Sequence, residues 1–557
     1  MYCKPVYEPI LPRSEDWPVV KLFKKRSAFL RKVVNKAIQD LSVLRQDATT
    51  LRQELSESLA YEQDCISASS WRVDLSNKAA FWQQAIEALR HEEIELNVIL
   101  QQIMMCYAQE IAGGFSKWHY QLAQTTASYT LDRLLTRTGP RSSRGASQIA
   151  DRLHTQIQIE GPIQHIRQLA HQGTIVMVPT HISHFDSVLI WWVIHTLGLP
   201  PFIYGAGLNL FNRQFFAYFM NKLGTYKVDR RKKNIAYLTT LKAYSVLALQ
   251  RGCHSLFYPG GTRSRSGSLE STLKLGLLGA AVEAQQSNYQ MHGPSAQKLF
   301  VVPVVLSYHS VLEAPHLIRN HLAEEGIQVK KCEASHQLNT PPYRLLRLIR
   351  NLSIKNVSAV VSFGQPLDVL GQPVDTAGRT YDATGAVVDT CTHFRKCYVG
   401  DAIDTEQLRE DTKQLGKAIV QSYRKHHWIL ASHWVAFVSF TMWQKQHTHM
   451  QLGDFWGLSP EVLAIPYTIF ERICSQVRAV LIAKCSAGEL QLDIHLREDE
   501  VADAIVHGIE NLGIHHMQRP LLKNHEGDII TQDLYTLFYY HNKLVGYGLE
   551  EACQLAR

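Results

Sequence analysis

The chain has no CxxC pair, and its 10 cysteines are scattered from Cys3 to Cys553. A reducing compartment is the simpler interpretation of such isolated cysteines. The N-terminus is also short of apolar sequence, because prolines and the acidic pair Glu15-Asp16 lie where a secretory signal needs an uninterrupted apolar segment. No signal peptide is therefore predicted, and nothing in the sequence suggests export.

Long hydrophobic runs are missing too, since no segment reaches the ~18 apolar residues that a membrane-spanning helix requires. The nearest candidate runs from Trp428 to Trp443, but it contains His433 and is followed by Gln444 and Lys445. A buried helix is the favoured interpretation of this stretch. Peripheral attachment of the protein to a membrane stays open.

The composition is that of a globular protein. Of 557 residues, 45% are hydrophobic and 19% are charged, which leaves room for about three or four domain-sized units. The net charge of +8 favours an anionic partner. Nucleic acid, anionic lipid and phosphorylated metabolites all fit this charge, so charge alone does not choose among them.

Residues 1–165 are predicted to form an N-terminal helical domain that ends in a linker. Apolar residues in Leu30–Leu44 follow helical spacing, and a second long helix is predicted over Phe81–Ile103, with Gly113-Gly114 ending it. The stretch 138–147 combines glycine, proline and arginine, and it is predicted to be the exposed linker.

Residues 166–370 alternate β-rich runs with helical ones, which predicts an α/β domain whose mostly parallel or mixed sheet is flanked by helices. Ligand sites of such sheets lie at the carboxyl ends of the strands. In chain order, the predicted strands and helices alternate as 174–178, 188–197, 202–204, 211–223, 226–228, 235–249, 255–258, 273–284 and 300–306.

The turn-rich segment 371–404 follows, and residues 405–557 are predicted to form a mainly helical C-terminal domain. The stretch Asp368–Asp375 is echoed by Asp382–Asp389, with glycines and aspartates in register. Two successive turns joined by short extended runs explain this pattern. A calcium loop is the alternative, but the acidic side chains are too sparse and lack the regular ligand spacing.

Residues 181–186 read His-Ile-Ser-His-Phe-Asp. A turn after the strand is expected to lift His181 out of the sheet, while Asp186 lies near the first turn of the next helix. An aspartate that accepts the Nδ1 proton of a histidine leaves Nε2 free as a general base. Ser183 is expected to help shape the turn. The alternative is a surface histidine beside an aspartate that caps a helix.

Residues 258–267 read Tyr-Pro-Gly-Gly-Thr-Arg-Ser-Arg-Ser-Gly. Gly260 and Gly261 permit backbone shapes and close approaches that side chains would block. Arg263 and Arg265 present planar forks that suit phosphate oxygens. The motif therefore predicts an anion-binding loop. An exposed basic turn that binds nothing in particular, or touches lipid headgroups, is the alternative.

A further basic run lies between these two motifs. Arg230 follows a short predicted strand, from which its side chain would reach the same phosphate. Its neighbours Arg231, Lys232 and Lys233 are predicted to form a solvated face or a membrane-surface patch, because adjacent side chains do not all converge on one small ligand.

With these residues the chain resembles the glycerolipid acyltransferase superfamily, and within it the bacterial type of glycerol-3-phosphate acyltransferase. The resemblance covers about Ile175 to Leu306 and rests on four ordered blocks: residues 181–186, 224–230, 258–267 and the strand Val302-Pro303-Val304. The phrase Phe363-Gly-Gln-Pro-Leu and the turns after it also look similar to the bacterial branch.

The resemblance implies transfer of a fatty acyl group from coenzyme A or acyl carrier protein to the 1-hydroxyl of sn-glycerol 3-phosphate, the first step of phospholipid synthesis. His181 would be the base and Asp186 would orient it, with direct attack on the thioester and neither metal nor cofactor. No nucleic acid partner is expected, and the expected location is peripheral, on the cytoplasmic side of an anionic cell membrane. The substrate-binding residues implied are Ser183, Arg230, Gly261, Thr262, Arg263, Ser264, Arg265 and Pro303.

One position departs from the family's pattern, since Gly260 stands where the family usually has glutamate. The missing carboxylate would alter acceptor choice, pass its role to a residue such as Glu270, or mark a branch that works without it. Dihydroxyacetone phosphate and 1-acylglycerol 3-phosphate are the alternative acceptors.

Two other classes of protein stay open at this point. A membrane-surface scaffold would use the basic run and amphipathic helices without needing His181. A metalloprotein would draw on scattered histidines and cysteines, although no complete ligand set is evident. The candidate metal ligands are Cys391, His393 and Cys397, or His447 and His449.

Overall fold

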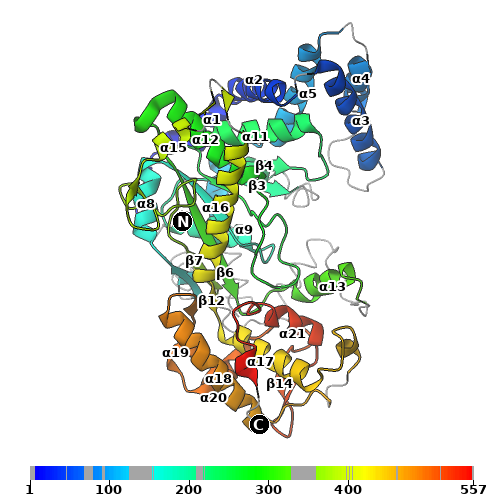
Figure 1. Ribbon diagram of the computed structural model, residues 1–557, viewed down its shortest axis with the longest axis vertical. Coiled ribbons are helices and arrows are strands. Elements are labelled where there is room, and N and C mark those ends of the chain that lie inside the picture. Colours follow the sequence, from blue (N-terminus) through cyan, green and yellow to red (C-terminus); the bar gives the residue numbers. More distant parts are fainter. Residues whose placement is uncertain are drawn as a thin grey trace.

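The structure is a computed structural model, and its centre is a seven-stranded sheet with the strand order β1-β7-β6-β2-β5-β3-β4. N-terminal helices lie above this sheet and C-terminal helices below it (Figure 1). The strands of the sheet are β1 (Ile157–Glu160), β2 (Thr174–Pro179), β3 (Ile203–Gly207), β4 (Thr225–Val228), β5 (Ser255–Leu256), β6 (Leu299–Tyr308) and β7 (Ala359–Phe363). The structure describes residues 7–45, 47–67, 79–90, 94–124, 153–154, 156–207, 218, 220–327, 359–396, 398–399, 402–403, 405–458, 462–514 and 516–554.

The predicted mixed α/β sheet is confirmed. Strands β2 to β6 pair in parallel, whereas β7 runs antiparallel to β6 and carries β1 at the sheet edge. Every strand predicted from the alternation is present, and most of the predicted helix 211–223 lies outside the described residues. Strand β1 precedes the predicted domain boundary at residue 165, yet it belongs to the central sheet.

Helices cover both faces of the sheet because alternate residues of each buried strand point to opposite sides. In β2, Ile175 and Met177 pack on one side with α9, whereas Val176 and Val178 pack on the other with α11, α12 and α16. The helices of this layer are α8 (Ile163–Gln172), α9 (Asp186–Thr196), α11 (Ile235–Gln250), α12 (Gly276–His292), α13 (Ala314–Glu324) and α16 (Thr405–Lys425), with the 3-10 turn η3 (Gly293–Ser295).

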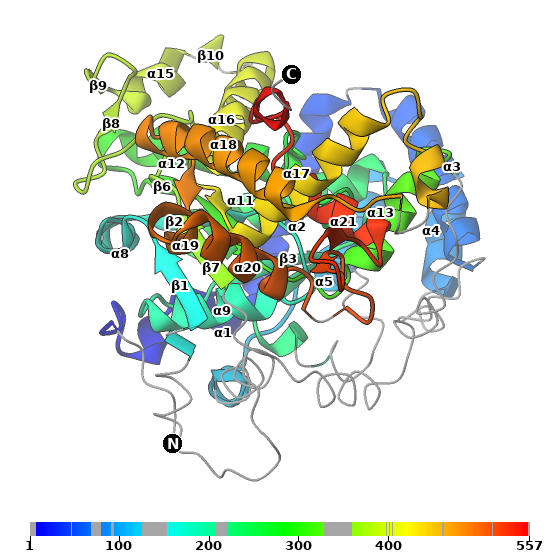
Figure 2. The same cartoon turned by 90° about the horizontal axis from the view of Figure 1, so that it is seen from below.

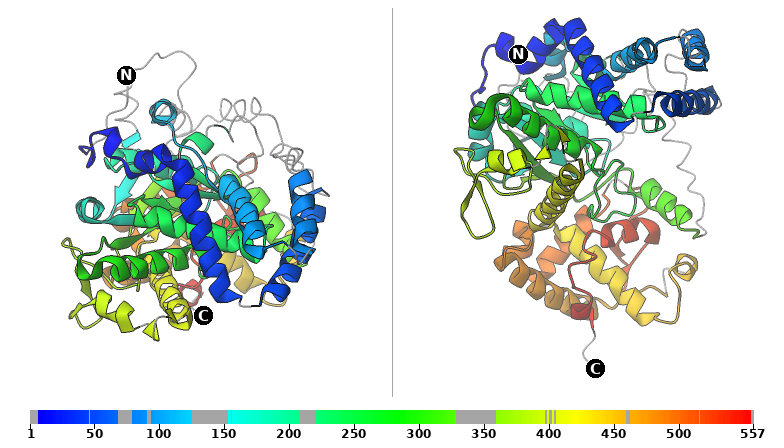
Figure 3. Two further views of the ribbon diagram at one scale, coloured as in Figure 1. Left: turned by 90° about the horizontal axis from the view of Figure 1, so that it is seen from above. Right: turned by 45° about the horizontal axis from the view of Figure 1, so that its top comes forward.

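The N-terminal helices pack on α11 and on the β3–β4 edge of the sheet, while α3 and α4 project outward (Figure 3). The predicted helix over Leu30–Leu44 is confirmed within α2, but the single helix predicted over Phe81–Ile103 is wrong. That stretch contains α4 and α5 as separate helices. The polar run from Arg90 to Glu95 interrupts the apolar pattern between them, and Ile94 is exposed. The elements are η1 (Ser14–Asp16), α1 (Pro18–Lys24), α2 (Arg26–Leu44), α3 (Ala48–Ser67), α4 (Ala79–Arg90) and α5 (Leu96–Ile111).

The C-terminal helices pack around α17, whose residues from Ala431 to Trp443 are all buried (Figure 2). The interpretation of Trp428–Trp443 as a buried stretch is therefore confirmed. Among the described residues, no helix is both long and apolar enough to cross a membrane. The elements are β12 (Trp428–Ile429), α17 (Ala431–Gln446), η5 (Asp454–Gly457), α18 (Tyr467–Ser486), β13 (Gln491–Leu492), α19 (Ile494–Glu498), α20 (Val501–Asn511), β14 (Leu522–Lys523), β15 (Ile529–Ile530), α21 (Leu534–His541) and η6 (Glu551–Cys553).

The turn-rich segment contains three turns of one kind where the sequence predicted two. Asp368, Asp375 and Asp382 each accept backbone N–H groups from the residues two and four positions later. The glycine three positions after each aspartate has a positive φ, as such turns require. Because the carboxylates are engaged by their own backbone, the turns explain the repeat. Around them lie β8 (Thr380–Tyr381), β9 (Val387–Val388), α15 (Thr390–Lys396), β10 (Tyr398–Val399) and β11 (Ala402–Ile403).

Candidate active site

The candidate site lies where the parallel strands β2, β4, β5 and β6 end, because their carboxyl ends meet on the same side of the sheet. His181 follows β2, the loop 258–267 follows β5, and Arg230 follows β4. Tyr308 is the last residue of β6 and lies at the same end of the parallel strands. Motifs that are far apart in the sequence are thereby brought to neighbouring strand ends.

His181 and Asp186 form a hydrogen-bonded pair, with 2.8 Å between Nδ1 and Oδ2. The Oδ2 atom also accepts the backbone N–H groups of Ile182 and Ser183 at 2.6 and 2.9 Å, and Oδ1 accepts the hydroxyl of Tyr308 at 2.8 Å. The Asp186 side chain is fully buried, whereas 19% of the His181 side chain is exposed. The carboxylate is therefore fixed by four donors, and the imidazole remains accessible through Nε2.

Two contacts hold the ring and the backbone of His181 against residues 258–267, which we call the arginine loop. The imidazole stacks on the ring of Tyr258, with centroids 4.1 Å apart and an interplanar angle of 22°. The backbone carbonyl of His181 accepts the N–H of Ser264 at 2.8 Å. The two motifs predicted from the sequence are thus joined directly, and the imidazole plane is set by Tyr258.

Glu270 occupies the space that a side chain at position 260 would need. Its Oε1 atom lies only 2.6 Å from the point where a Cβ of residue 260 would be. Position 260 therefore has to be glycine as long as the Glu270 side chain has this conformation. The same Oε1 accepts the backbone N–H of His181 at 2.9 Å, and Oε2 is buried without a hydrogen-bond partner in the described residues. A carboxylate is therefore present beside the turn that carries His181, although position 260 is glycine.

Burial raises the pKa of Glu270 to about 8, and the negative charge of Asp186 adds to the rise, while the His181 N–H and Lys543 oppose it. Burial lowers the pKa of Lys543 to about 8, and the two carboxylates Asp186 and Glu270 oppose this change. Lys543 follows α21, so the C-terminal domain supplies a buried cation near the candidate site.

The raised pKa of Glu270 has a consequence for stability that can be measured. Between pH 4.5 and about 8, the folded protein keeps this proton while the unfolded chain releases it. The contribution to stability is therefore complete below pH 4.5 and is lost as the pH rises through about 8. In Glu270→Gln the side chain does not titrate, so its Tm relative to wild type should increase from pH 5 to pH 7.

Scanning calorimetry of both proteins at pH 5, 6 and 7 checks this expectation. One unit of pKa shift corresponds to about 1.4 kcal/mol. The free energy of unfolding of wild type relative to Glu270→Gln therefore falls by at most this amount for each pH unit. Glu526→Gln is the matched control, because this glutamate lies exposed in the turn between β14 and β15. A Tm difference between Glu270→Gln and wild type that stays constant over this range would show that Glu270 titrates normally.

The two loop arginines are paired with carboxylates of the segment after β6. Arg263 contacts Glu313, with 3.3 Å between Nη1 and Oε1, and Arg265 pairs with Glu324 at the surface. Glu313 also accepts the Ser183 hydroxyl at 3.0 Å. Arg263 is thus connected to the turn that carries His181, while a phosphate at Arg265 would have to replace Glu324.

Arg230 lies apart from this pair. It is exposed, and its guanidinium lies beside Gly207 of β3. Strand β4 is two places from β5, which leads into the loop that carries Arg263 and Arg265, a distance of roughly 10 Å at about 4.8 Å per strand. Arg230 follows the carboxyl end of β4, as predicted, but no described contact joins it to Arg263 or Arg265.

The other predicted substrate-binding residues take different positions. Gly261 has φ +81°, and its N–H donates to the Tyr258 carbonyl, so a glycine is needed in this turn. Thr262 is exposed, and the Ser264 hydroxyl donates to the Ser268 carbonyl. Pro303 is buried inside β6 beside Val178, so its influence on a substrate would be indirect.

Lys232 was predicted to belong to a solvated face or a membrane-surface patch, and this surface position is wrong. Only 7% of its side chain is exposed, and Nζ lies 2.7 Å from Glu110 and over the rings of Trp82, Tyr107 and Tyr237. Its neighbour Arg231 pairs with Asp229, and Lys233 is exposed. Of the three predicted patch residues, Lys233 is the one whose charge faces solvent without an ion pair among the described residues.

Sequence comparison adds one finding to this geometry. Residues 158–307 match the model of a protein family described as Acyltransferase. This range contains both motifs, β2 to β5 and all but the last residue of β6. The chain therefore carries an acyltransferase domain, and the enzyme class is acyltransferase. A solved structure of the 1-acyl-sn-glycerophosphate (LPA) acyltransferase PlsC from Thermotoga maritima is also similar, covering 54% of this chain and 92% of that one, with 14% identity and a TM-score of 0.24.

Proposed function

We propose that the protein is a glycerol-3-phosphate 1-O-acyltransferase. The observation that carries the proposal is the His181–Asp186 pair, held within one hydrogen bond of the loop that bears Arg263 and Arg265. A general base beside two arginines suits deprotonation of a hydroxyl on a phosphorylated acceptor. The fatty acyl donor would be acyl-coenzyme A or acyl carrier protein, whose thioester supplies the leaving group.

The proposed reaction follows from the free Nε2 atom of His181. This atom takes the proton of the acceptor's 1-hydroxyl as the oxygen attacks the thioester carbonyl. The tetrahedral intermediate collapses, the C–S bond breaks, and the departing thiolate takes the proton from the imidazolium. Asp186 stabilises the imidazolium between these steps. Acyl transfer is direct, so the reaction forms no acyl-enzyme.

The small acceptor is favoured over 1-acylglycerol 3-phosphate because the C-terminal domain packs against the arginine loop. Asn542 donates to the Ser266 carbonyl at 2.9 Å, and a side chain at Gly267 would collide with the backbone of Tyr539. The loop is therefore covered on this side. Glycerol 3-phosphate needs less room there than an acceptor that already carries an acyl chain.

An acceptor panel tests the proposed substrate. Purified protein is given acyl-coenzyme A or acyl carrier protein together with glycerol 3-phosphate, dihydroxyacetone phosphate or 1-acylglycerol 3-phosphate. We expect the highest kcat/KM with glycerol 3-phosphate. A higher kcat/KM with 1-acylglycerol 3-phosphate would assign the second step of acylation instead, while preserving the roles of His181 and Asp186.

The phosphate role of the loop predicts a selective effect of Arg265→Lys. Lysine keeps the positive charge but lacks the planar fork that binds two phosphate oxygens. The acceptor KM is therefore expected to rise by about 10-fold, which is roughly 1.4 kcal/mol, with the donor KM unchanged. Steady-state kinetics with each substrate varied in turn measures both constants, and Arg379→Lys on the distant turn-rich segment is the control. A change in the donor KM alone would contradict the assignment.

The proposed location is peripheral, on an anionic membrane surface where long-chain products dissolve. Lys233 would contribute roughly 1 kcal/mol to such binding, and this contribution weakens with salt because the Debye length is about 8 Å at physiological ionic strength. We expect flotation with anionic vesicles at low salt, less at high salt, and less for Lys233→Glu. Equal recovery with neutral and anionic vesicles at every salt concentration would contradict electrostatic docking.

A further inference from the structure

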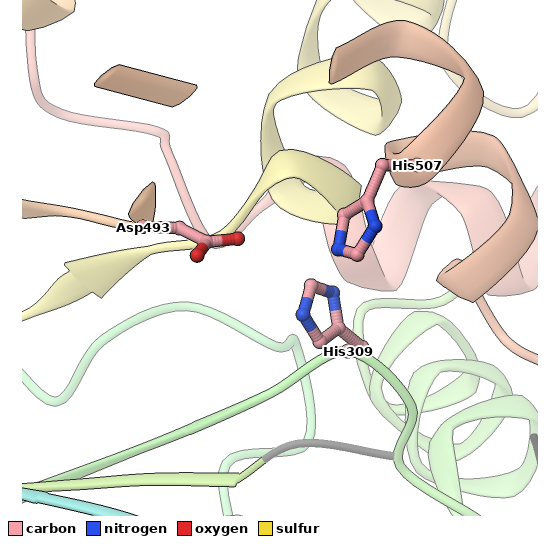
Figure 4. Close-up of side chains that lie close together, drawn as sticks. All are labelled: His309, Asp493 and His507. Carbon is pink, nitrogen blue, oxygen red and sulfur yellow. The ribbon is translucent and has the colours of Figure 1, made fainter. Parts of the chain in front are cut away.

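His309, Asp493 and His507 converge on one point between the catalytic domain and the C-terminal domain (Figure 4). One ligand atom from each side chain lies within 4.8 Å of the other two. His309 directly follows β6 of the sheet, Asp493 follows β13, and His507 belongs to α20. Two imidazoles and a carboxylate are a donor set that divalent transition-metal ions prefer.

Asp493 is placed in a way that ordinary helix capping does not explain. It is the N-cap residue of α19, yet its side chain makes no capping hydrogen bond. The residue is 8% exposed, and Oδ2 is buried without a hydrogen-bond partner in the described residues. A buried carboxylate oxygen without a partner costs free energy. Its orientation toward the two imidazoles provides the reason for this placement that capping does not.

The histidines are also held as metal ligands usually are. Nδ1 of His309 lies 2.9 Å from the Ser432 hydroxyl, which fixes the ring and leaves Nε2 to bind. The His507 ring stacks on His495, with centroids 3.7 Å apart, and His495 is held by Asp499 at 2.8 Å. A second layer of side chains thus orients both imidazoles.

We propose that His309, Asp493 and His507 bind one divalent transition-metal ion, which fastens the C-terminal domain to the catalytic domain. A tetrahedral zinc site has bonds of about 2.0–2.1 Å and ligand atoms roughly 3.3 Å apart, so binding draws the three side chains inward by about an ångström, and water completes the shell. The site goes beyond the proposed acyl transfer, because none of its residues touches His181 or the arginine loop within the described part of the chain.

The position gives the ion a structural consequence for the active site. His309 is adjacent to Tyr308, whose hydroxyl donates to Asp186 at 2.8 Å. The carbonyl of Tyr308 accepts a hydrogen bond from Nε2 of His433 at 3.0 Å. Fixing His309 against α20 therefore fixes the end of β6 that supports the catalytic aspartate. The ion itself takes no part in the reaction.

The test uses the full chain, produced without a histidine tag and stripped of metal. Zn²⁺ is titrated by calorimetry, Co²⁺ is followed by visible absorption, and Tm is measured with and without Zn²⁺. The test variants are Asp493→Asn and His507→Ala, the second at a half-buried side chain, and the control is His525→Ala at an exposed position in the turn between β14 and β15. Circular dichroism checks that each variant is folded.

Wild type and His525→Ala are expected to bind one Zn²⁺ per chain, to give the strong visible bands of four-coordinate Co²⁺, and to gain Tm with Zn²⁺. Asp493→Asn and His507→Ala should bind Zn²⁺ at least about 10-fold more weakly. The proposal is overturned if wild type binds no Zn²⁺ and its Tm does not change, or if both folded variants keep the wild-type affinity. Acyl transfer is not measured, so failure of this site leaves the proposed function untouched.

Discussion

Replacing His181 by alanine is expected to lower kcat by about 10²–10⁴-fold while the protein stays folded, which is the usual cost of losing a positioned general base. His181 is the imidazole whose Nδ1 is held by Asp186 and whose ring is set by Tyr258. Without it, nothing at this position takes the proton of the acceptor hydroxyl. Initial rates of thiol release from acyl-coenzyme A measure the effect, with circular dichroism and Tm confirming the fold.

His171→Ala is the matched control for this variant, because His171 lies exposed near the end of α8 and belongs to neither motif. Its kcat should equal that of wild type. Turnover of folded His181→Ala within a few-fold of wild type would refute the role of this histidine as the base. Loss of activity accompanied by a collapse of Tm would instead show a structural role for the side chain.

Asp186→Asn is expected to give the second-largest loss, on the order of 10²-fold in kcat, near the lower end of the range for general-base catalysis. The Oδ2 atom of Asp186 accepts three N–H donors and Oδ1 accepts the Tyr308 hydroxyl. An amide has only one oxygen and carries no charge. It would place an NH₂ group against donors, or keep the contacts without stabilising the imidazolium.

Tyr308→Phe separates the charge of Asp186 from its hydrogen bonds. This variant removes one donor to Oδ1 and keeps the carboxylate, so its kcat should fall by less than about 10-fold, in line with one lost hydrogen bond of roughly 1 kcal/mol. Rates of both variants under identical conditions make the comparison. An equal loss in the two variants would mean that positioning of the carboxylate, and not its charge, supports His181.

The sequence predicts the hydrogen-bonded pair of His181 and Asp186 because this contact is local. Asp186 lies five positions after His181, and one turn between β2 and α9 brings the two side chains together. The alternation of strands and helices predicts the sheet for a similar reason, since each strand is a short apolar run between turn residues. Because β2 and β5 pair in parallel, the arginine loop after β5 lies beside the turn after β2.

The residues that were missed depend on contacts over long sequence distances. Tyr308 reaches the site from the last position of β6, Glu313 from the segment after it, and Lys543 from the C-terminal helical region, so no local pattern marks them. The sequence misassigns Lys232 because its acidic partner Glu110 lies on α5, far away in the sequence. Glu270 was a named candidate for the missing carboxylate, but only the packing against Gly260 shows that its side chain fills that space.

The most direct measurement of the central claim follows radiolabelled glycerol 3-phosphate in the presence of acyl-coenzyme A or acyl carrier protein, with the products separated and the acylated hydroxyl identified. Wild type is predicted to convert the label to 1-acylglycerol 3-phosphate with at least one of the two donors, and folded His181→Ala to form about 10²-fold less or lower still. If folded wild type forms no acylated glycerol phosphate with either donor, or if His181→Ala forms as much product as wild type, the account is wrong.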